Sequence, residues 1–146
     1  MASGALEPQT GGLARSDCLI VRDLERSLDW YEAAFGFRPT RRVDLPAAGL
    51  RVACAEAGGV VIELCEPAQR GGEGRATPAE SLAHRGAGQV SFTVADARAA
   101  LRAAEARGLS LVWGIADNAP LGMRAFLLRD PDGHVVELLE ALPGEG

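Results

Sequence analysis

The sequence contains no lysine, no long apolar run and only two histidines, and these shortages narrow the possible functions. All 15 basic residues are arginine, and 20 acidic residues outnumber them, which leaves a net charge of −5. This charge disfavours a nucleic acid or an anionic membrane as a partner. No stretch approaches the roughly 20 apolar residues that a membrane-spanning helix needs.

The N-terminal residues and the cysteines indicate in which cellular compartment the protein is expected. The start, MASGALEPQTGG, has neither a basic segment nor a long apolar one. We therefore expect a disordered lead-in over residues 1–15 and no secretory signal. The three cysteines, Cys18, Cys54 and Cys65, are odd in number and lack the spacing of a metal site. We expect reduced thiols in a cytoplasmic protein, with a disulfide as the less favoured alternative.

An internal repeat is the most informative feature of the chain. The segment CLIVRDLERSLDWYEAAFGF begins at Cys18, and VSFTVADARAALRAAEARGL begins at Val90. Each has a short β-rich run, an aspartate, a helical stretch and a glycine. The units also end alike, in GGVVIELCE and DGHVVELLE, which place Glu63 and Glu137 at an offset of 74.

Each unit predicts the same elements. Asp23 and Asp96 are good helix N-caps, and Gly36 and Gly108 stand where a helix ends in a left-handed residue. Three β-like runs follow each helix, at about 37–44, 49–55 and 60–65, and at about 109–115, 122–129 and 134–140. The sequence therefore predicts an α+β fold made of two βαβββ modules.

The modules are separated by a segment of different composition. The predicted first module covers residues 16–66 and the second covers 88–141, within one domain, with a tail over 142–146. Residues 67–87 are rich in Gly, Pro and Ala, which favours a flexible linker or a flap over a cavity mouth. Two half-size sheets joined in this way pair within one chain or swap between two chains, and the sequence leaves both open.

Alternation along the last strand of each module predicts where the two glutamates point. Val61, Glu63 and Cys65 share one strand face, as Val135, Glu137 and Leu139 do. The opposite faces are apolar and are expected to pack on the helices. Glu63 and Glu137 therefore lie on the face turned away from the helices.

The segments VRDLERSLDWYEAAFGF and RDPDGHVVELLE resemble the vicinal-oxygen-chelate superfamily, which includes glyoxalase I, bleomycin-type resistance proteins, extradiol dioxygenases and methylmalonyl-CoA epimerase. The resemblance covers about residues 16 to 141. It implies that the two modules form curved mixed sheets around a cup-shaped cavity. Because this fold serves several chemistries, the resemblance fixes the fold more firmly than the function.

The resemblance also implies four metal-ligand positions, here Ser16, Glu63, Gln89 and Glu137. Metal-using relatives carry histidine at one or both of the first-strand positions, whereas this chain has Ser16 and Gln89 there. Without imidazole, affinity for Zn²⁺, Ni²⁺ or Fe²⁺ should fall. We therefore predict an eroded site with no metal or a weakly held Mg²⁺ or Mn²⁺. The structural alternative pairs the glutamates with Arg51, Arg124 or Arg129.

Two functions remain open on these residues. The first is a metal-poor protein that binds a small, hydrophobic or aromatic molecule in the cavity, with Trp113 as a stacking surface. The second is a lyase, isomerase or epimerase in which Glu63 or Glu137 moves a proton next to a carbonyl. A glutathione substrate is not supported, because Ile20 replaces an arginine of glyoxalase relatives. We expect a homodimer, and the candidate ligand-binding residues are Cys18, Arg51, Cys65, Trp113, Arg124 and Phe126.

Overall fold

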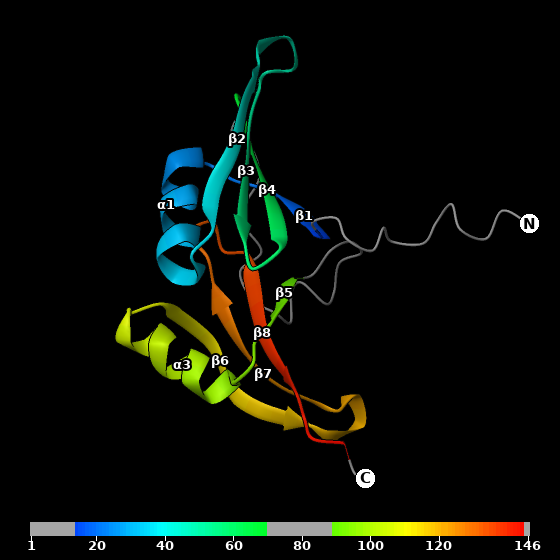
Figure 1. Ribbon diagram of the computed structural model, residues 1–146. Helices are drawn as coiled ribbons and strands as arrows, with labels where there is room; N and C mark the ends of the chain where they lie inside the picture. Colours follow the sequence, from blue (N-terminus) through cyan, green and yellow to red (C-terminus); the bar gives the residue numbers. More distant parts are fainter. Residues whose placement is uncertain (1–13, 70–88, 145–146) are drawn as a thin grey trace, which may run out of the picture.

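The computed structural model describes residues 14–69 and 89–144 and contains two modules of the same construction (Figure 1). The predicted lead-in, most of the predicted linker and the end of the tail lie outside the described residues. None of the helices in the described ranges is both long and apolar enough to cross a membrane.

The element order confirms two βαβββ modules. The first comprises β1 (Ala14–Ile20), α1 (Leu24–Phe35), β2 (Arg38–Leu45), a 3-10 turn η1 (Pro46–Ala48), β3 (Leu50–Ala57) and β4 (Val60–Pro67). The second comprises β5 (Val90–Thr93), α3 (Ala97–Ala106), β6 (Ser110–Asn118), a 3-10 turn η2 (Ala119–Leu121), β7 (Met123–Arg129) and β8 (Val135–Ala141).

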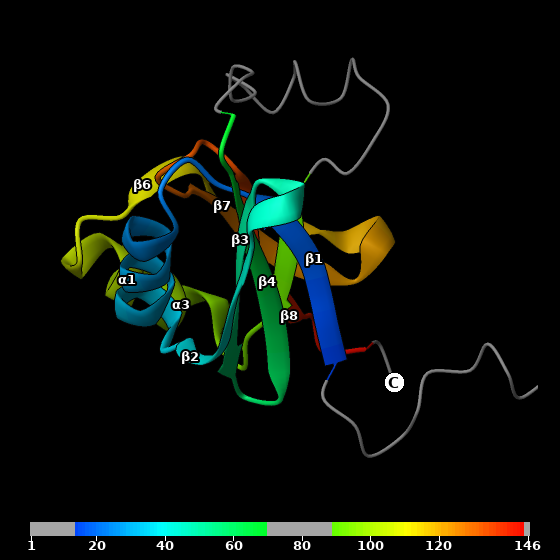
Figure 2. The same cartoon turned by 90° about the horizontal axis from the view of Figure 1, so that it is seen from above.

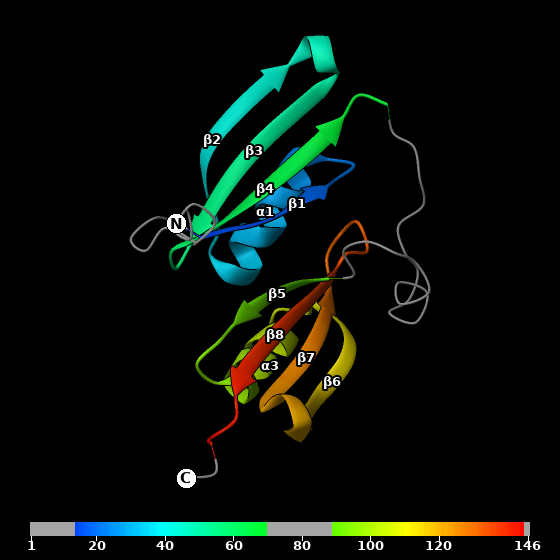
Figure 3. The same ribbon diagram turned by 90° about the vertical axis from the view of Figure 1, so that its right-hand side faces the viewer.

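Each module folds into one mixed sheet of four strands. The strand order is β1-β4-β3-β2 in the first sheet and β5-β8-β7-β6 in the second. In both, the first strand lies parallel to the last, and the remaining pairs are antiparallel. Figure 3 shows the two sheets one above the other, with α1 and α3 behind them. The first and last strands of a module are therefore neighbours although they are far apart in the sequence.

The predicted aspartates begin both helices. Asp23 accepts a hydrogen bond from the backbone N–H of Arg26 at 3.1 Å, and Asp96 accepts one from Ala99 at 2.9 Å. Each bond satisfies a donor that the first helical turn leaves without an intrahelical partner. At the other end of α1, Gly36 has φ of 75°, the left-handed conformation that favours glycine.

A second acid from the last strand also contacts the start of each helix. Glu66 accepts a hydrogen bond from the backbone N–H of Leu24 at 2.7 Å. Glu140 accepts one from Ala97 at 2.8 Å. A carboxylate at this end of a helix is favoured by the helix dipole. The last glutamates of VVIELCE and HVVELLE therefore join each helix to its sheet.

The hydrophobic core lies between the sheets and their helices (Figures 1 and 2). Tyr31 on α1 is fully buried, and Phe126 on β7 is 1% exposed. The core is continuous across both modules, since Phe35 and Phe37 contact Phe92 with ring centroids 5.8 and 5.3 Å apart. The other buried members include Leu24, Leu28, Ile62, Leu64, Leu128, Val136 and Leu138.

The turn before β8 joins the two modules through polar contacts. Asp130 in this turn is only 5% exposed and accepts a hydrogen bond from the Tyr31 hydroxyl at 2.9 Å. Asp132 accepts from the backbone N–H of Arg22 at 3.0 Å and from the Ser27 hydroxyl at 3.2 Å. The acidic turn RDPDGH therefore docks on α1 and on the residue before its N-cap.

Candidate functional site on the open faces of the two sheets

Each sheet has a helix face, which packs on α1 or α3, and an open face on the opposite side. Within the described ranges, no helix covers either open face (Figure 3). Residues that pair across neighbouring strands project to the same side of a sheet. The registers therefore determine which side chains meet on each open face, and they place one glutamate in the middle of each.

Four residues form a row across the open face of the second sheet. Glu137 on β8 pairs with Ser91 on β5 and with Leu127 on β7, and Leu127 pairs with Trp113 on β6. Leu127 is 6% exposed, whereas Trp113 is 62% exposed. The row thus runs from a hydroxyl and a carboxylate, through an apolar residue, to an indole that is open to solvent. Trp113 lies on the side where the sequence predicts a cavity.

Glu137 is part of a short chain of hydrogen bonds. The Ser91 hydroxyl donates to Glu137 Oε1 at 2.9 Å, and the Gln89 side-chain amide donates to Ser91 Oγ at 3.4 Å. The amide N–H of Gln89 points to Ser91, so Gln89 is connected to Glu137 through this hydroxyl. One oxygen of the Glu137 carboxylate is satisfied by an internal donor.

The equivalent row on the first sheet is rich in thiols. Glu63 on β4 pairs with Cys18 on β1 and with Cys54 on β3, and Cys54 pairs with Arg41 on β2. Cys65 follows Glu63 by two positions and so lies on the same face. All three cysteines of the chain therefore lie on the face that carries Glu63.

Two of these thiols touch each other. Cys18 Sγ and Cys65 Sγ are 2.8 Å apart, and the Cys65 thiol donates to Glu63 Oε1 at 3.6 Å. Cys18 is exposed and Cys65 is buried. Burial raises the pKa of Cys65 to about 12 and also raises the pKa of Cys18. At neutral pH both are therefore thiols, which argues against Cys18 or Cys65 as an activated nucleophile.

The four positions implied as metal ligands are divided between the sheets. Ser16 lies on β1 and Glu63 on β4, whereas Gln89 precedes β5 and Glu137 lies on β8. In the part of the chain that the structure describes, one group of three His, Cys, Asp or Glu residues has ligand atoms that all lie within 4.8 Å of one another. It consists of Cys18, Glu63 and Cys65. The four-residue set remains a prediction, and these cysteines are an addition to it.

The six candidate ligand-binding residues lie on two different faces. Cys18, Cys65 and Trp113 lie on the open faces. Phe126 belongs to the core, Arg124 pairs with Asp117 at 2.6 Å, and Arg51 contacts Glu66. Arg51, Arg124 and Phe126 thus lie on the helix face. They pair with Glu66, Glu140 and Leu138, whose side chains also point to the helices. These three residues therefore do not line the open faces, where the sequence predicts the ligand.

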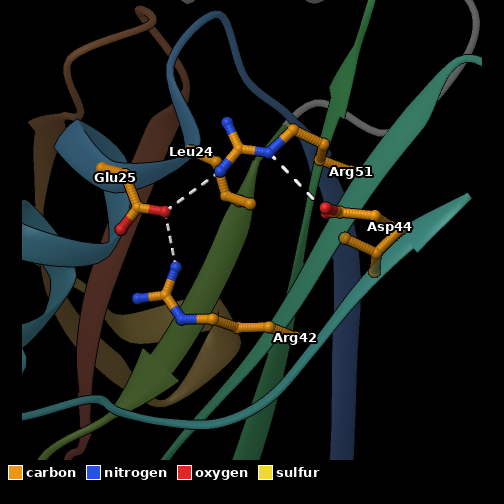
Figure 4. A pocket seen from close by; sticks show the side chains of 6 residues that line it. Leu24, Glu25, Arg42, Asp44 and Arg51 are labelled. Carbon is orange, nitrogen blue, oxygen red and sulfur yellow. Dashed lines mark hydrogen bonds and ion pairs between the residues drawn. The ribbon is translucent and has the colours of Figure 1, made fainter. Parts of the chain in front are cut away.

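The helix side of the first sheet carries a separate, charged pocket of about 370 Å³ (Figure 4). Glu25 from α1 accepts from Arg42 at 2.5 Å and from Arg51 at 3.2 Å, and Arg51 also lies 3.8 Å from Asp44. These arginines therefore pair with acids around α1 instead of with Glu63. About half of each Arg42 and Glu25 side chain is exposed, so each pair adds little stability.

His134 lies beside the inter-module turn. Its Nδ1 is 2.7 Å from Asp130 Oδ2, the same oxygen that accepts from Tyr31. This contact turns the imidazole ring of His134 towards Asp130. The histidine thus belongs to the contact between the modules.

Sequence reasoning missed the thiol group because its members are distant in the chain. Cys18 and Cys65 are 47 positions apart and become neighbours only when β1 pairs with β4. Strand alternation puts Cys65 with Glu63 and Cys18 with Ser16. Parallel pairing of the first and last strands, which the βαβββ order suggests, is the signal that would have brought the two together.

The family follows from comparison with known proteins. A family model described as the glyoxalase/bleomycin resistance protein/dioxygenase superfamily matches residues 13–138. The chain belongs to this superfamily. The predicted resemblance is thereby confirmed, and so is the predicted fold of two βαβββ modules. No match was found among curated proteins.

Several solved structures have a similar fold. A glyoxylase/bleomycin resistance protein/dioxygenase domain from Frankia sp. EAN1pec is 20% identical with a TM-score of 0.71, covering 94% of this chain and 96% of that one. TioX from Micromonospora sp. ML1 is 26% identical with a TM-score of 0.64, covering 90% and 100%. A glyoxalase I mutant from Zea mays is 17% identical with a TM-score of 0.65, covering 90% and 45%.

Proposed function

We propose that this superfamily member binds a small, planar aromatic molecule on the open face of the second sheet. The observation that carries the proposal is the position of Trp113, which is 62% exposed and lies in one row with Leu127 and Glu137. Leaving a large aromatic side chain in water forgoes about 1.5–3 kcal/mol of hydrophobic free energy. A flat ligand on the indole would recover part of this.

The row also indicates which ligands fit best. Trp113 and Glu137 are separated by one strand, and strands lie about 4.8 Å apart, so their backbones are about 10 Å apart. The carboxylate accepts hydrogen bonds, and the chain has a net charge of −5. An aromatic ligand with an amino or other donor group suits both ends of the row, whereas an anionic ligand does not.

The proposal does not require a metal at Glu137. The Ser91 hydroxyl already donates to the carboxylate, and Gln89 donates to Ser91. The polar end of the row is therefore held in place by the protein itself. This supports a binding role for an eroded metal position, as the replacement of histidine by Gln89 suggested.

The test is equilibrium binding of three named probes. We expect 9-aminoacridine and 1-naphthylamine to bind with Kd of about 100 µM or tighter, and naphthalene-1-sulfonate to bind more weakly. Trp113→Ala should weaken binding more than about tenfold, because aromatic side chains that a ligand covers on binding carry much of the binding energy. Leu121→Ala is the matched control, because Leu121 is 63% exposed but lies in η2. Equal effects of the two substitutions would refute the proposal.

Two further expectations accompany this proposal. A homodimer is expected, and sedimentation equilibrium of the full chain measures it directly. A cytoplasmic location is expected from the sequence and is measured by cell fractionation. The binding test does not depend on either expectation, and each is tested by its own measurement.

A further inference from the structure

The open face of the first sheet gathers three donors that proteins use to hold thiophilic cations. One ligand atom each from Cys18, Glu63 and Cys65 lies within 4.8 Å of the other two. They come from two strands, since Cys18 is on β1 and the other two are on β4. The parallel pairing of these strands holds the donors together, so the group does not depend on a loop.

One of the two measured donor–donor distances matches a tetrahedral Zn²⁺ site, and the other is shorter than such a site requires. With Zn–S of about 2.3 Å and Zn–O of about 2.1 Å, tetrahedral ligands lie about 3.6 Å apart for S and O and about 3.8 Å apart for two S atoms. Cys65 Sγ and Glu63 Oε1 are 3.6 Å apart, whereas Cys18 Sγ and Cys65 Sγ are 2.8 Å apart. Rotation of the exposed Cys18 side chain provides the missing ångström.

We propose that Cys18, Cys65 and Glu63 bind a thiophilic divalent cation, with Zn²⁺ as the test ion, on the open face of the first sheet. This site differs from the four-residue set expected at the family positions, because two of its ligands are cysteines and all three belong to one module. On binding, the cation displaces the protons of both thiols into solvent, and the resulting two thiolates and one carboxylate select Zn²⁺ over the hard ions Mg²⁺ and Mn²⁺. The exposure of Cys18 leaves the fourth position open to water.

A disulfide between Cys18 and Cys65 is the competing use of the same thiols. It would form with loss of two protons and two electrons to an oxidant such as a peroxide. Glu63 has no part in that reaction, although it lies within the group and contacts Cys65. A cation uses all three donors, and for this reason we favour the metal site.

The experiment uses the reduced full chain and Co²⁺ as a spectroscopic substitute for Zn²⁺. We expect one equivalent of Co²⁺ to produce a thiolate-to-metal charge-transfer absorption, and one equivalent of Zn²⁺ to abolish it, whereas excess Mg²⁺ leaves it unchanged. Cys18→Ser and Cys65→Ser should each weaken Zn²⁺ binding by more than about tenfold, which is the loss that removal of even an outer partner can cause. Glu63→Gln should weaken binding without abolishing the charge-transfer band.

Cys54→Ser is the matched control, since Cys54 lies on the same face opposite Glu63 but outside the group of three. We expect it to change Zn²⁺ affinity less than about threefold. Because Cys18 is exposed, Cys18→Ser should fold normally even if the buried Cys65→Ser does not. Absence of a charge-transfer band would overturn the proposal, as would a band that survives Cys18→Ser unchanged. A protein that binds no Zn²⁺ but loses two hydrogens in mass with peroxide would establish the disulfide instead.

Discussion

The hydroxyl of Tyr31 on α1 donates a 2.9 Å hydrogen bond to Asp130, which lies in the other module. Tyr31 is fully buried and Asp130 is 5% exposed. Asp130 also accepts from the backbone N–H groups of Asp132 and His134, at 2.9 and 2.8 Å. One buried carboxylate thus shapes the turn before β8 and attaches it to the first module.

This arrangement predicts unequal costs for removing the two partners. Asp130→Ala should lower the free energy of unfolding by about 2–3 kcal/mol, because it leaves the buried Tyr31 hydroxyl and two backbone donors without an acceptor. Tyr31→Phe should cost about 1 kcal/mol, because Asp130 keeps its other donors. Urea unfolding measures both values. A larger cost for Tyr31→Phe would contradict the assigned role of Asp130.

The same pair predicts a loss of stability at alkaline pH. Burial, together with the nearby Asp130 carboxylate, raises the pKa of Tyr31 well above its ordinary value. The folded chain therefore holds the phenol proton more tightly than the unfolded chain does. This contribution is fully present below a pH of about 10, the unfolded pKa, and is lost as the pH rises further.

Tyr31 is the only tyrosine, so phenolate absorbance reports on one group. We expect it to appear together with unfolding, as followed by circular dichroism, and not at the pH where a free tyrosine ionises. Tyr31→Phe provides the control, since its stability should depend less steeply on pH in this range. Phenolate absorbance near a pH of about 10 in a chain that is still folded would contradict the burial of this hydroxyl.

The glutamates that bind the helix starts should contribute alike in the two modules. Glu66→Ala and Glu140→Ala each remove an acceptor from a first-turn N–H, at Leu24 and Ala97, and should each lower the free energy of unfolding by about 1 kcal/mol. The exposed Glu105→Ala on α3 serves as the comparison and should change stability by less than about 0.5 kcal/mol. Thermal unfolding of the three variants decides whether the contacts matter.

Glu137→Gln separates binding from proton transfer. The amide oxygen of glutamine can still accept from Ser91, so we expect 1-naphthylamine to bind within about threefold of its original affinity. An enzyme that used Glu137 as a base would instead lose turnover, because an amide cannot take up the proton. Isothermal titration of the variant measures the first outcome. Loss of all probe binding would show that the carboxylate charge, and not the indole, dominates recognition.

Local signals explain what could be predicted from the sequence. Asp23 and Asp96 are recognisable as caps because capping depends on the few residues that follow. The placement of Glu63 and Glu137 on the sheet faces turned away from the helices follows from alternation within a single strand. These features need no knowledge of which strands pair. The repeated pattern doubled the evidence for each of them.

Features that depend on register were not accessible in the same way. Phe126 is in the core because it pairs with Leu138, and that register is set by the turn around Asp130. Trp113 lies between two irregularities in the pairing of β6 with β7, so simple counting along β6 does not fix its face. The contact of Cys18 with Cys65 likewise exists only through the pairing of β1 with β4.

Binding of an aromatic ligand at Trp113 can be followed at the two indole N–H signals in a ¹H–¹⁵N spectrum. The chain has two tryptophans, and Trp30→Phe assigns the signals. Trp30 packs against Tyr31 and Phe35 beside the core, whereas Trp113 is 62% exposed. On addition of 1-naphthylamine, we expect a saturable shift of the Trp113 signal and no shift of the Trp30 signal. A saturable shift confined to Trp30, or no shift of either signal, would contradict this expectation.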